Sequence, residues 1–254
     1  MKRFTSLTGL IPFILLLLLW QGASAGNLWT AYILPAPETV WQTGYKMLRT
    51  GELLRHILIS LRRILWGFSW AFLLSILCSS LGLLYPHLRR WYSGILEVLR
   101  HVPPISLIPL LILWFGIGEL PKTIIIVLAS FFPMYLNMDD GFRHCDSKLL
   151  EVGKILGFTP LETLRKIRLP AALPSILTGL KLGMGYSLRA IIGAEMVASD
   201  SGLGYLILDA QAMSRSDKVI IGILVIGGLG LLLDGIFSGL TWWLLPYERK
   251  AAHD

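Results

Sequence analysis

Three ionisable residues within long apolar segments are the first candidates for chemistry: Arg100, Arg189 and Glu195. Charged groups are costly inside a bilayer, so those that occur there commonly line the path of a solute or ion. A cation such as Arg100 beside a water-filled path would bind a small anion, and His101 adjoins it in the sequence. An equally weighted alternative is that Arg100 extends to the membrane interface, where its neighbour Glu97 would position it.

The other charged residues near the apolar segments are expected to have structural roles. Arg189 and Glu195 lie nearly two helical turns apart, so they need not pair, and Glu195 is expected to cap or brace the outer end of the bundle. Lys181 is close enough to the cytoplasmic end to extend towards it. Arg62 and Arg63 are expected to extend to the outer edge or to face a partner.

Catalytic motifs are absent from the sequence. It contains no GxxxxGK[ST] phosphate-binding loop, no GxSxG nucleophile turn and no HExxH zinc helix. The five histidines lack the spacing of zinc ligands, and Cys78 and Cys145 form no CxxC pair. We therefore expect no enzyme, no metal site, no bound cofactor and no disulfide framework.

Composition indicates a helical membrane protein. Of the 254 residues, 54% are hydrophobic and 15% charged, whereas a soluble domain carries about 25% charged residues. A bilayer-spanning helix needs roughly 20 apolar residues. The six candidate spans are residues 10–25, 57–85, 92–116, 121–138, 173–197 and 219–245. Pro103 and Pro104 should bend the third span.

The distribution of basic residues predicts the orientation. A net charge of +7 could suggest nucleic acid, but the basic residues flank the apolar spans, which argues against a nucleic-acid partner. With the amino terminus inside, twelve basic residues fall in cytoplasmic segments and six in outer segments, which favours two cytoplasmic termini. The cytoplasmic set is Lys2, Arg3, Arg89, Arg90, Arg143, Lys148, Lys154, Arg165, Lys166, Arg168, Arg249 and Lys250, and the outer set is Lys46, Arg49, Arg55, Lys122, Arg215 and Lys218.

The first 55 residues leave two alternatives open. The basic start, the apolar run at 11–20 and Ala-Ser-Ala at 23–25 are also typical of a cleaved secretory signal. Because five further spans follow, we expect residues 1–33 to stay as a transmembrane helix. Residues 34–55 should form an outer loop with a short helix that lies on the membrane surface or packs as an ordinary loop helix. Its apolar positions are Val40, Trp41, Tyr45 and Leu48.

Small residues recur every four positions in two spans. Gly179, Gly183 and Ser187 do so in the fifth, and Gly235 and Gly239 in the sixth. Such stripes let helices approach closely in a bilayer. They fit contacts within one subunit or between two subunits, and the first is preferred.

A polar, basic segment at residues 147–171 separates the fourth and fifth spans. Asp146 or Ser147 can cap a helix that runs to about residue 156. Gly157 follows, where a left-handed residue commonly ends a helix. The sequence therefore predicts a short helix that ends in a sharp bend.

A second short helix should follow the bend. Thr159, Pro160 and Glu162 have the spacing of a capping box with proline at the first helical position, and Pro170 should discourage continuation. The residues expected to pack onto the bundle are Leu161, Leu164 and Ile167. Those expected to stay available for a partner are Glu151, Arg165 and Arg168.

The same segment holds Glu151, Val152, Gly153, Gly157, Ile167, Leu169 and Pro170 in a fixed order. This order resembles the coupling loop of permease subunits of ATP-binding-cassette (ABC) importers, although Val152 and Gly153 stand where alanines are usual. Further similar stretches include Leu-Pro-Ala-Pro at 34–37, Arg-His-Val-Pro-Pro at 100–104, Leu-Trp-Phe-Gly-Ile-Gly-Glu at 113–119 and Gly-Leu-Gly-Tyr at 202–205. Together they resemble the branch that imports aliphatic sulfonates, taurine and nitrate.

The resemblance implies an all-α membrane subunit of six spans with the type I, methionine-permease-like importer fold. Residues 56–245 would form the core and 246–254 a cytoplasmic tail. It implies a homodimer in the bacterial inner membrane, two ATPase subunits that hold ATP and magnesium, and a periplasmic binding protein. Glu151 and Arg165 would contact the ATPase, while Ala171 and Pro174 would join the loop to the fifth span.

The sequence leaves the substrate open. A sulfonate or taurine is expected first, and nitrate, cyanate, bicarbonate or a thiamine or riboflavin precursor second. Two other classes of protein fit less well. A membrane enzyme would need clustered acid–base or metal residues, and a secondary transporter commonly has inverted repeats, which the sequence lacks.

Overall fold

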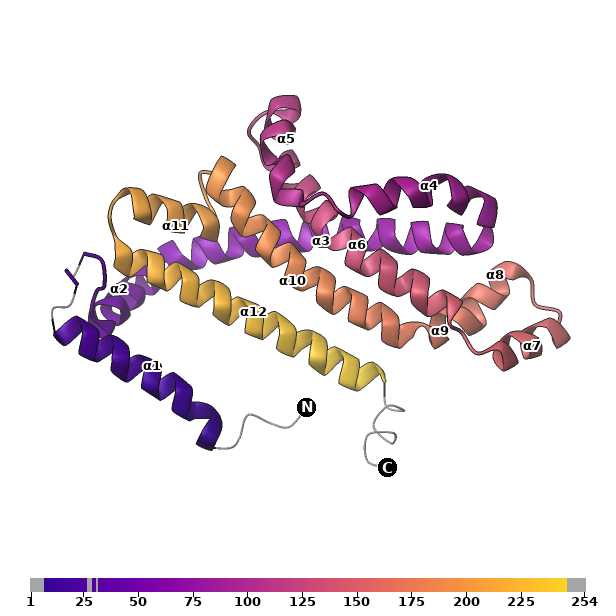
Figure 1. Cartoon of the computed structure of the whole chain (residues 1–254), viewed down its shortest axis with the longest axis horizontal. Coiled ribbons are helices and arrows are strands. Elements are labelled where there is room, and N and C mark those ends of the chain that lie inside the picture. Colours follow the sequence, from indigo (N-terminus) through magenta and orange to yellow (C-terminus); the bar gives the residue numbers. More distant parts are fainter. Residues whose placement is uncertain (1–6, 27–28, 31, 246–254) are drawn as a thin grey trace.

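The computed structural model describes residues 7–26, 29–30 and 32–245, and the regular elements within them are all helical (Figure 1). They are α1 (Leu7–Ala25), α2 (Pro37–Arg49), α3 (Glu52–Leu84), α4 (Pro86–Leu99), the 3-10 helix η1 (Pro104–Leu107), α5 (Ile108–Phe115), α6 (Glu119–Arg143), α7 (Ser147–Ile155), α8 (Pro160–Thr163), the π-helix η2 (Leu164–Arg168), α9 (Leu169–Ala171), α10 (Leu173–Ala198), α11 (Leu203–Ala212) and α12 (Ser216–Leu244). The all-α prediction is confirmed. The predicted tail, 246–254, and the basic residues at 2 and 3 lie outside the described residues.

The centre of the bundle is α6, which packs along α3 on one side and α10 on another. Small residues on α10 make the second contact possible. A side chain on Gly183 would come within 2.6 Å of Met134, and Ser187 donates a hydrogen bond to the Ser130 hydroxyl at 3.0 Å. The predicted packing of this stripe within the subunit is therefore confirmed. The second stripe differs, because no described atom lies within 4 Å of a side chain built on Gly235 or Gly239.

The described helices supply three to five crossings of a bilayer. Three single helices, α3, α6 and α12, are long and apolar enough. Two more crossings are bent pairs: α4 with η1–α5, at 88°, and α10 with α11, at 44°. The third predicted span is thus two helices, because the prolines at 103 and 104 lack the N–H groups that would continue α4. In α1, the described apolar part, Ile14–Ala25, is shorter than a full crossing.

The predicted loop helix is α2, and it has two apolar faces. Val40 and Met47 are buried against α3, α11 and α12. Trp41, Tyr45 and Leu48 are exposed, Trp41 to 78%. Val40 therefore lies on the face of α2 that packs on the bundle, as the alternative of an ordinary packed loop helix predicts, while the other three predicted apolar positions lie on a separate, exposed face.

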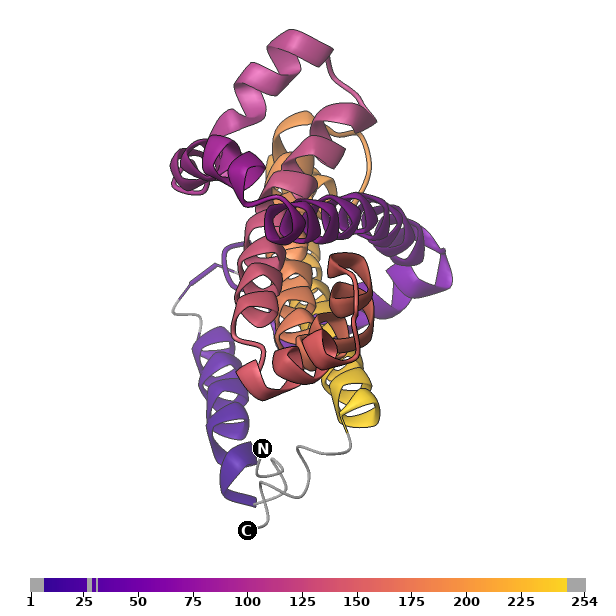
Figure 2. The same ribbon diagram turned by 90° about the vertical axis from the view of Figure 1, so that its right-hand side faces the viewer.

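The bundle has two distinct ends. Figure 1 shows α2 and α11 at one end of the molecule and α7 to α9 at the other. Figure 2 looks onto the second end, where α7 and α8 project from the bundle. We call these the α2–α11 end and the α7–α9 end. Lys181, on α10, does not extend to the α7–α9 end: it pairs with Asp234 of α12 at 3.3 Å.

Candidate functional site

The projecting segment between α6 and α10 is the first candidate site. Asp146 caps α7 by accepting a hydrogen bond from the backbone N–H of Lys148 at 2.9 Å. After α7, Gly157 has φ of +68°, in the left-handed region that favours glycine. The predicted cap and the predicted bend are both confirmed.

The second helix begins with the predicted capping box. The backbone N–H of Glu162 donates to the Thr159 hydroxyl at 3.3 Å, and the Glu162 carboxylate accepts from the backbone N–H of Thr159 at 3.0 Å. Lys166 pairs with the same carboxylate at 2.9 Å. The Thr159 N–H above all, and then Lys166, lower the pKa of Glu162 to about 2. Glu162 is therefore ionised at neutral pH.

Beyond the capping box the chain differs from the prediction. The π-helix η2 continues directly into α9, so the helix passes through Pro170 and ends one residue later, at Ala171. Arg168, expected to be available, donates to the backbone carbonyl of Phe142 at 2.6 Å. The expectation that Pro170 discourages continuation agrees with this helix end, whereas the expectation that Arg168 is free is wrong.

Two of the three predicted packing residues face the protein. Leu164 is buried, and Ile167 is half-buried against α7. A side chain on Gly153 would meet Ile167 at 2.6 Å, so the absence of a side chain there permits this contact. Leu161 is 64% exposed and does not pack inward.

The surface of this segment is apolar with charges beside it. Ile155 is 83% exposed, and Leu149, Leu156 and Leu161 are also exposed. Among the predicted contact residues, Glu151, Val152, Gly157, Arg165 and Pro170 are exposed, Ile167 and Leu169 are half-buried, and Gly153 is buried. Exposed apolar clusters rimmed by polar residues are typical of surfaces that bind proteins.

Three of the four predicted path residues line one cavity. Arg100 and His101, after α4, and Arg189, on α10, border a space of about 550 Å³ beside α6. The Arg189 guanidinium lies 5.6 Å from the ring centroid of Tyr186, and Arg100 pairs with Glu97. The cavity therefore combines cationic side chains from two elements far apart in the sequence, and Glu97 positions one of them.

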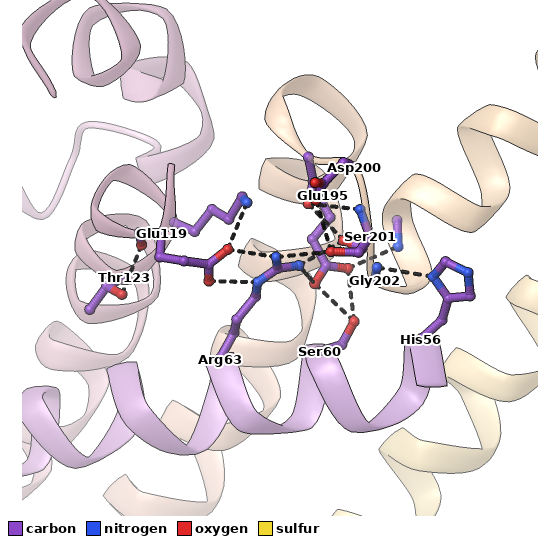
Figure 3. Close-up of polar contacts among 12 residues, drawn as sticks. His56, Ser60, Arg63, Glu119, Thr123, Glu195, Asp200, Ser201 and Gly202 are labelled. Carbon is purple, nitrogen blue, oxygen red and sulfur yellow. Dashed lines mark hydrogen bonds and ion pairs between the residues drawn. The ribbon is translucent and has the colours of Figure 1, made fainter. Parts of the chain in front are cut away.

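Glu195 lies elsewhere, in a buried network at the α2–α11 end (Figure 3). Its carboxylate accepts hydrogen bonds from the Ser60 hydroxyl at 2.8 and 2.9 Å, from Arg63 at 2.9 Å and from the backbone N–H of Gly204 at 3.0 Å. The side chain thus binds the start of α11 and joins α10 to α3. This geometry agrees with the predicted bracing role.

The expectation that Arg63 extends to the outer edge or faces a partner is wrong. It is buried, while its neighbour Arg62 is exposed. Its Nε and Nη2 donate to both oxygens of Glu119 at 2.8 and 2.6 Å, and its Nη1 donates to the Ser201 carbonyl at 2.7 Å. The guanidinium avoids the membrane interface because these acceptors, from α6 and the α10–α11 turn, satisfy it inside the protein.

Glycine makes the turn between α10 and α11 possible. Gly202 has φ of +110°, and a side chain there would lie 2.2 Å from the Glu195 carboxyl carbon. Its N–H donates to His56 Nδ1 at 3.1 Å, while the Leu203 N–H donates to Ser60. His56, Ser60 and Arg63 fall on one face of α3, and this polar face is the one sequence pattern that points to the network; the partners on α6 and α10 leave no local pattern.

Residues 71–241 match the family described as the inner membrane component of binding-protein-dependent transport systems. The chain belongs to this family. It is 36% identical over 98% of its length, and over 90% of the relative, to a Bacillus subtilis (strain 168) protein named aliphatic sulfonates transport permease protein SsuC. It is 32% identical to the taurine transport system permease protein TauC of Escherichia coli (strain K12), over 92% of this chain and 87% of that protein.

Solved structures agree on the fold of this permease. An inward-facing structure of the MetNI methionine ABC transporter matches with a TM-score of 0.62 at 16% identity, over 76% of the permease and 95% of that chain. Family and fold together make the chain an inner-membrane, multi-pass permease of an ABC importer, which is not itself catalytic. Membership of a binding-protein-dependent system implies an ATPase and a binding protein as partners.

Proposed function

We propose that two copies of this permease form the path of a small organic anion, an aliphatic sulfonate or taurine, into the cytoplasm. A periplasmic binding protein would deliver the anion, and two ATPase subunits would bind ATP and magnesium. Two relatives named for sulfonate and taurine transport support this class of substrate. The α7–α9 end and both termini would lie in the cytoplasm, as the excess of basic residues predicts.

The observation that carries the choice of an anion is the cavity bordered by Arg100, His101 and Arg189. Guanidinium groups bind sulfonates well because their planar N–H donors match two oxygens of the anion at once. The Tyr186 ring beside Arg189 and the apolar wall of α6 would suit a short aliphatic tail. The pairing of Arg100 with Glu97 leaves Arg189 as the stronger candidate for direct contact.

Coupling to ATP hydrolysis would use the exposed apolar surface of α7 and α8. Ile155, Leu156 and Leu161 would enter the ATPase surface, with Glu151 and Arg165 as polar contacts at its edge. Movement of the ATPase would pass through η2 and α9 into α10, because these helices follow one another without an intervening loop. The permease would then alternate between two rigid-body states biased by nucleotide and by the loaded binding protein.

Uptake by the reconstituted importer tests the choice of substrate. Proteoliposomes with permease, ATPase and binding protein should take up labelled taurine or an alkanesulfonate in an ATP-dependent manner. Arg189→Gln should raise KM about tenfold, the usual effect of one lost charge-assisted hydrogen bond, without changing basal ATP hydrolysis. Arg62→Gln, an exposed arginine of α3, is the matched control. Unchanged KM in Arg189→Gln, or uptake of nitrate but not sulfonates, would contradict the proposed path or substrate.

The coupling role has a separate test. Glu151→Lys and Gly157→Val should abolish uptake and substrate-stimulated ATP hydrolysis while both variants still insert into the membrane. Glu38→Lys, an exposed charge reversal on α2, should leave both activities unchanged. Normal uptake in the first two variants at normal expression would contradict the coupling role.

A further inference from the structure

Four arginines border a second cavity, at the α7–α9 end of the permease. The cavity measures about 500 Å³ and lies where the end of α3, the start of α4, the end of α6 and the end of η2 meet. It is separate from the cavity of the proposed solute path. Its cationic residues are Arg89, Arg90, Arg143 and Arg168.

The positive charge of this cavity is not balanced. Asp139 pairs with Arg89 at 2.8 Å and with Arg143 at 3.0 Å, so one carboxylate serves two guanidinium groups. Arg168 bonds to a neutral backbone carbonyl. Within the described part of the chain Arg90 has no acidic partner. Four cations therefore surround the space with one paired anion, in contrast to the network around Glu195.

Hydrogen-bond donors around the cavity also lack acceptors. The Nε–H of Arg89 is buried and has no hydrogen-bond partner among the described residues. The start of α4, at Pro86, borders the cavity, so the positive end of the α4 dipole adds to the positive charge there. Ser93 adds a hydroxyl to the lining. A bound anion would supply acceptors to the Arg90 guanidinium and the Ser93 hydroxyl, which border the cavity.

The geometry and charge point to a phosphate group. Its three or four oxygens can accept from several guanidinium groups at once, and helix N-termini bind phosphates in the same way. The residues beside the cavity favour a lipid as its source. Tyr85, just before α4, and Trp91, on α4, are exposed, Trp91 to 82%, and such aromatic residues are typical of the membrane interface. Basic pockets between membrane helices on the cytoplasmic side commonly hold acidic headgroups.

We propose that this cavity binds a phosphate group, and that an acidic phospholipid of the adjoining leaflet supplies it. The assignment to the cytoplasmic leaflet rests on the orientation given under the proposed function, whereas the phosphate site itself does not. Because Arg168 ends η2 and Arg143 ends α6, the bound headgroup joins α4 to the segment that carries α7 and α8. An acidic lipid would thereby hold the projecting segment in place.

Native mass spectrometry of the purified full-length permease, with phosphatidylglycerol or phosphatidylcholine added, tests the proposal directly. Arg90→Gln/Arg143→Gln should weaken retention of the first phosphatidylglycerol about 25-fold, because each basic residue near an acidic headgroup contributes about fivefold. Arg90→Gln alone, an exposed position without an ion pair among the described residues, should weaken it about fivefold without affecting folding. Arg62→Gln, at the other end of α3, should have no effect.

A second arm distinguishes the two sources of phosphate. Inorganic phosphate is titrated into the same permease in neutral detergent, and thermal stability is followed. Retention of phosphatidylglycerol over phosphatidylcholine that depends on Arg90 and Arg143 supports the whole proposal. Stabilisation by inorganic phosphate without such lipid preference would overturn the lipid source and keep the phosphate site. If the variants change neither lipid retention nor stabilisation by inorganic phosphate, the phosphate site is overturned. That result would leave the proposed uptake of sulfonates unaffected.

Discussion

The two ends of the permease hold their polar groups in opposite ways. At the α2–α11 end, the cations Arg63 and Lys122 balance the carboxylates Glu119 and Glu195 in one network, in which both Arg63 and Glu195 are buried. At the α7–α9 end, α7 and α8 are ordered by caps between residues two or three apart, and their apolar side chains face outward. Long-range ion pairs and hydrogen bonds thus join the helices at the first end, whereas the caps that order α7 and α8 at the second end are local.

This difference bears on how force could pass through the molecule. A buried, fully paired network resists rearrangement, because each broken contact would leave a desolvated charge without a partner. A locally capped segment keeps its shape without depending on the bundle, so it can move as a unit when a partner binds its exposed surface. We therefore expect α7 and α8 to move as a rigid unit, while the network keeps α3, α10 and α11 fixed relative to one another.

Removal of Arg63 should produce the largest effect and would show whether the α2–α11 end is the rigid one. Arg63→Met leaves Glu195 buried without its cation and should lower the free energy of unfolding by about 3–5 kcal/mol. Denaturant unfolding in micelles measures this value. Arg62→Met, its exposed neighbour, should change it by less than about 0.5 kcal/mol. Equal losses of unfolding free energy in the two variants would show that the network around Arg63 does not stabilise this end.

A pair of glycine substitutions compares the two ends at positions with left-handed backbone. Gly202→Ala should cost about 3 kcal/mol, since the new methyl group would meet the Glu195 carboxylate at 2.2–2.4 Å. Gly157→Ala should cost about 1 kcal/mol of backbone strain, because no described atom lies within 4 Å of the added carbon. The same unfolding measurement applies. A larger loss of unfolding free energy in Gly157→Ala than in Gly202→Ala would contradict the conclusion that the α2–α11 end is the more rigid one.

Loss of the helix cap should affect the α7–α9 end alone. Thr159→Ala removes the acceptor for the Glu162 N–H and should lower the local opening free energy of α8 by about 1 kcal/mol. Hydrogen exchange of the α8 amides measures it. Thr178→Ala, an exposed threonine inside α10, is the control. Faster exchange in α11 as well would indicate that the two ends are not independent.

The smallest effect concerns pH. The pKa of Glu162 is about 2 in the folded segment and 4.5 without its partners, so its contribution is fully present above pH 4.5 and is lost as the pH falls towards 2. Protection of α8, corrected for intrinsic exchange rates, should stay flat from pH 8 to 5 and fall below pH 4. Glu162→Gln should remove this dependence. A fall in protection between pH 7 and 6 would contradict the assignment.

Most features that depend on residues close in the sequence were predicted correctly, whereas most of those that depend on distant contacts were not. The Asp146 cap, the Gly157 bend and the capping box at Thr159 involve residues close in the sequence, and all three are confirmed. The π-helical geometry of η2 was missed, because its i→i+5 bond carries no recognisable residue pattern.

Distant contacts escaped prediction for a different reason. Arg63 lies 132 positions from Glu195 and 56 from Glu119, so its burial depends on how three helices pack and not on its own segment. Arg100, His101 and Arg189 were singled out as charges within apolar spans, and three-dimensional packing then brings them to one cavity. Glu195 was grouped with them because it is also a charge within an apolar span. Packing instead places it against Ser60 and Arg63, away from that cavity.

Cysteine cross-linking shows whether the α7–α9 end binds the ATPase. Ile155→Cys, at an 83% exposed site, and Trp41→Cys, at a 78% exposed site on α2, would each be made in a Cys78→Ser/Cys145→Ser background. Ile155→Cys should cross-link to the ATPase in a nucleotide-sensitive way and should be shielded from an impermeant maleimide in intact spheroplasts. Trp41→Cys should react with that maleimide and form no such cross-link. Labelling of Ile155→Cys from outside, or its failure to reach the ATPase in an importer that transports normally, would contradict the account.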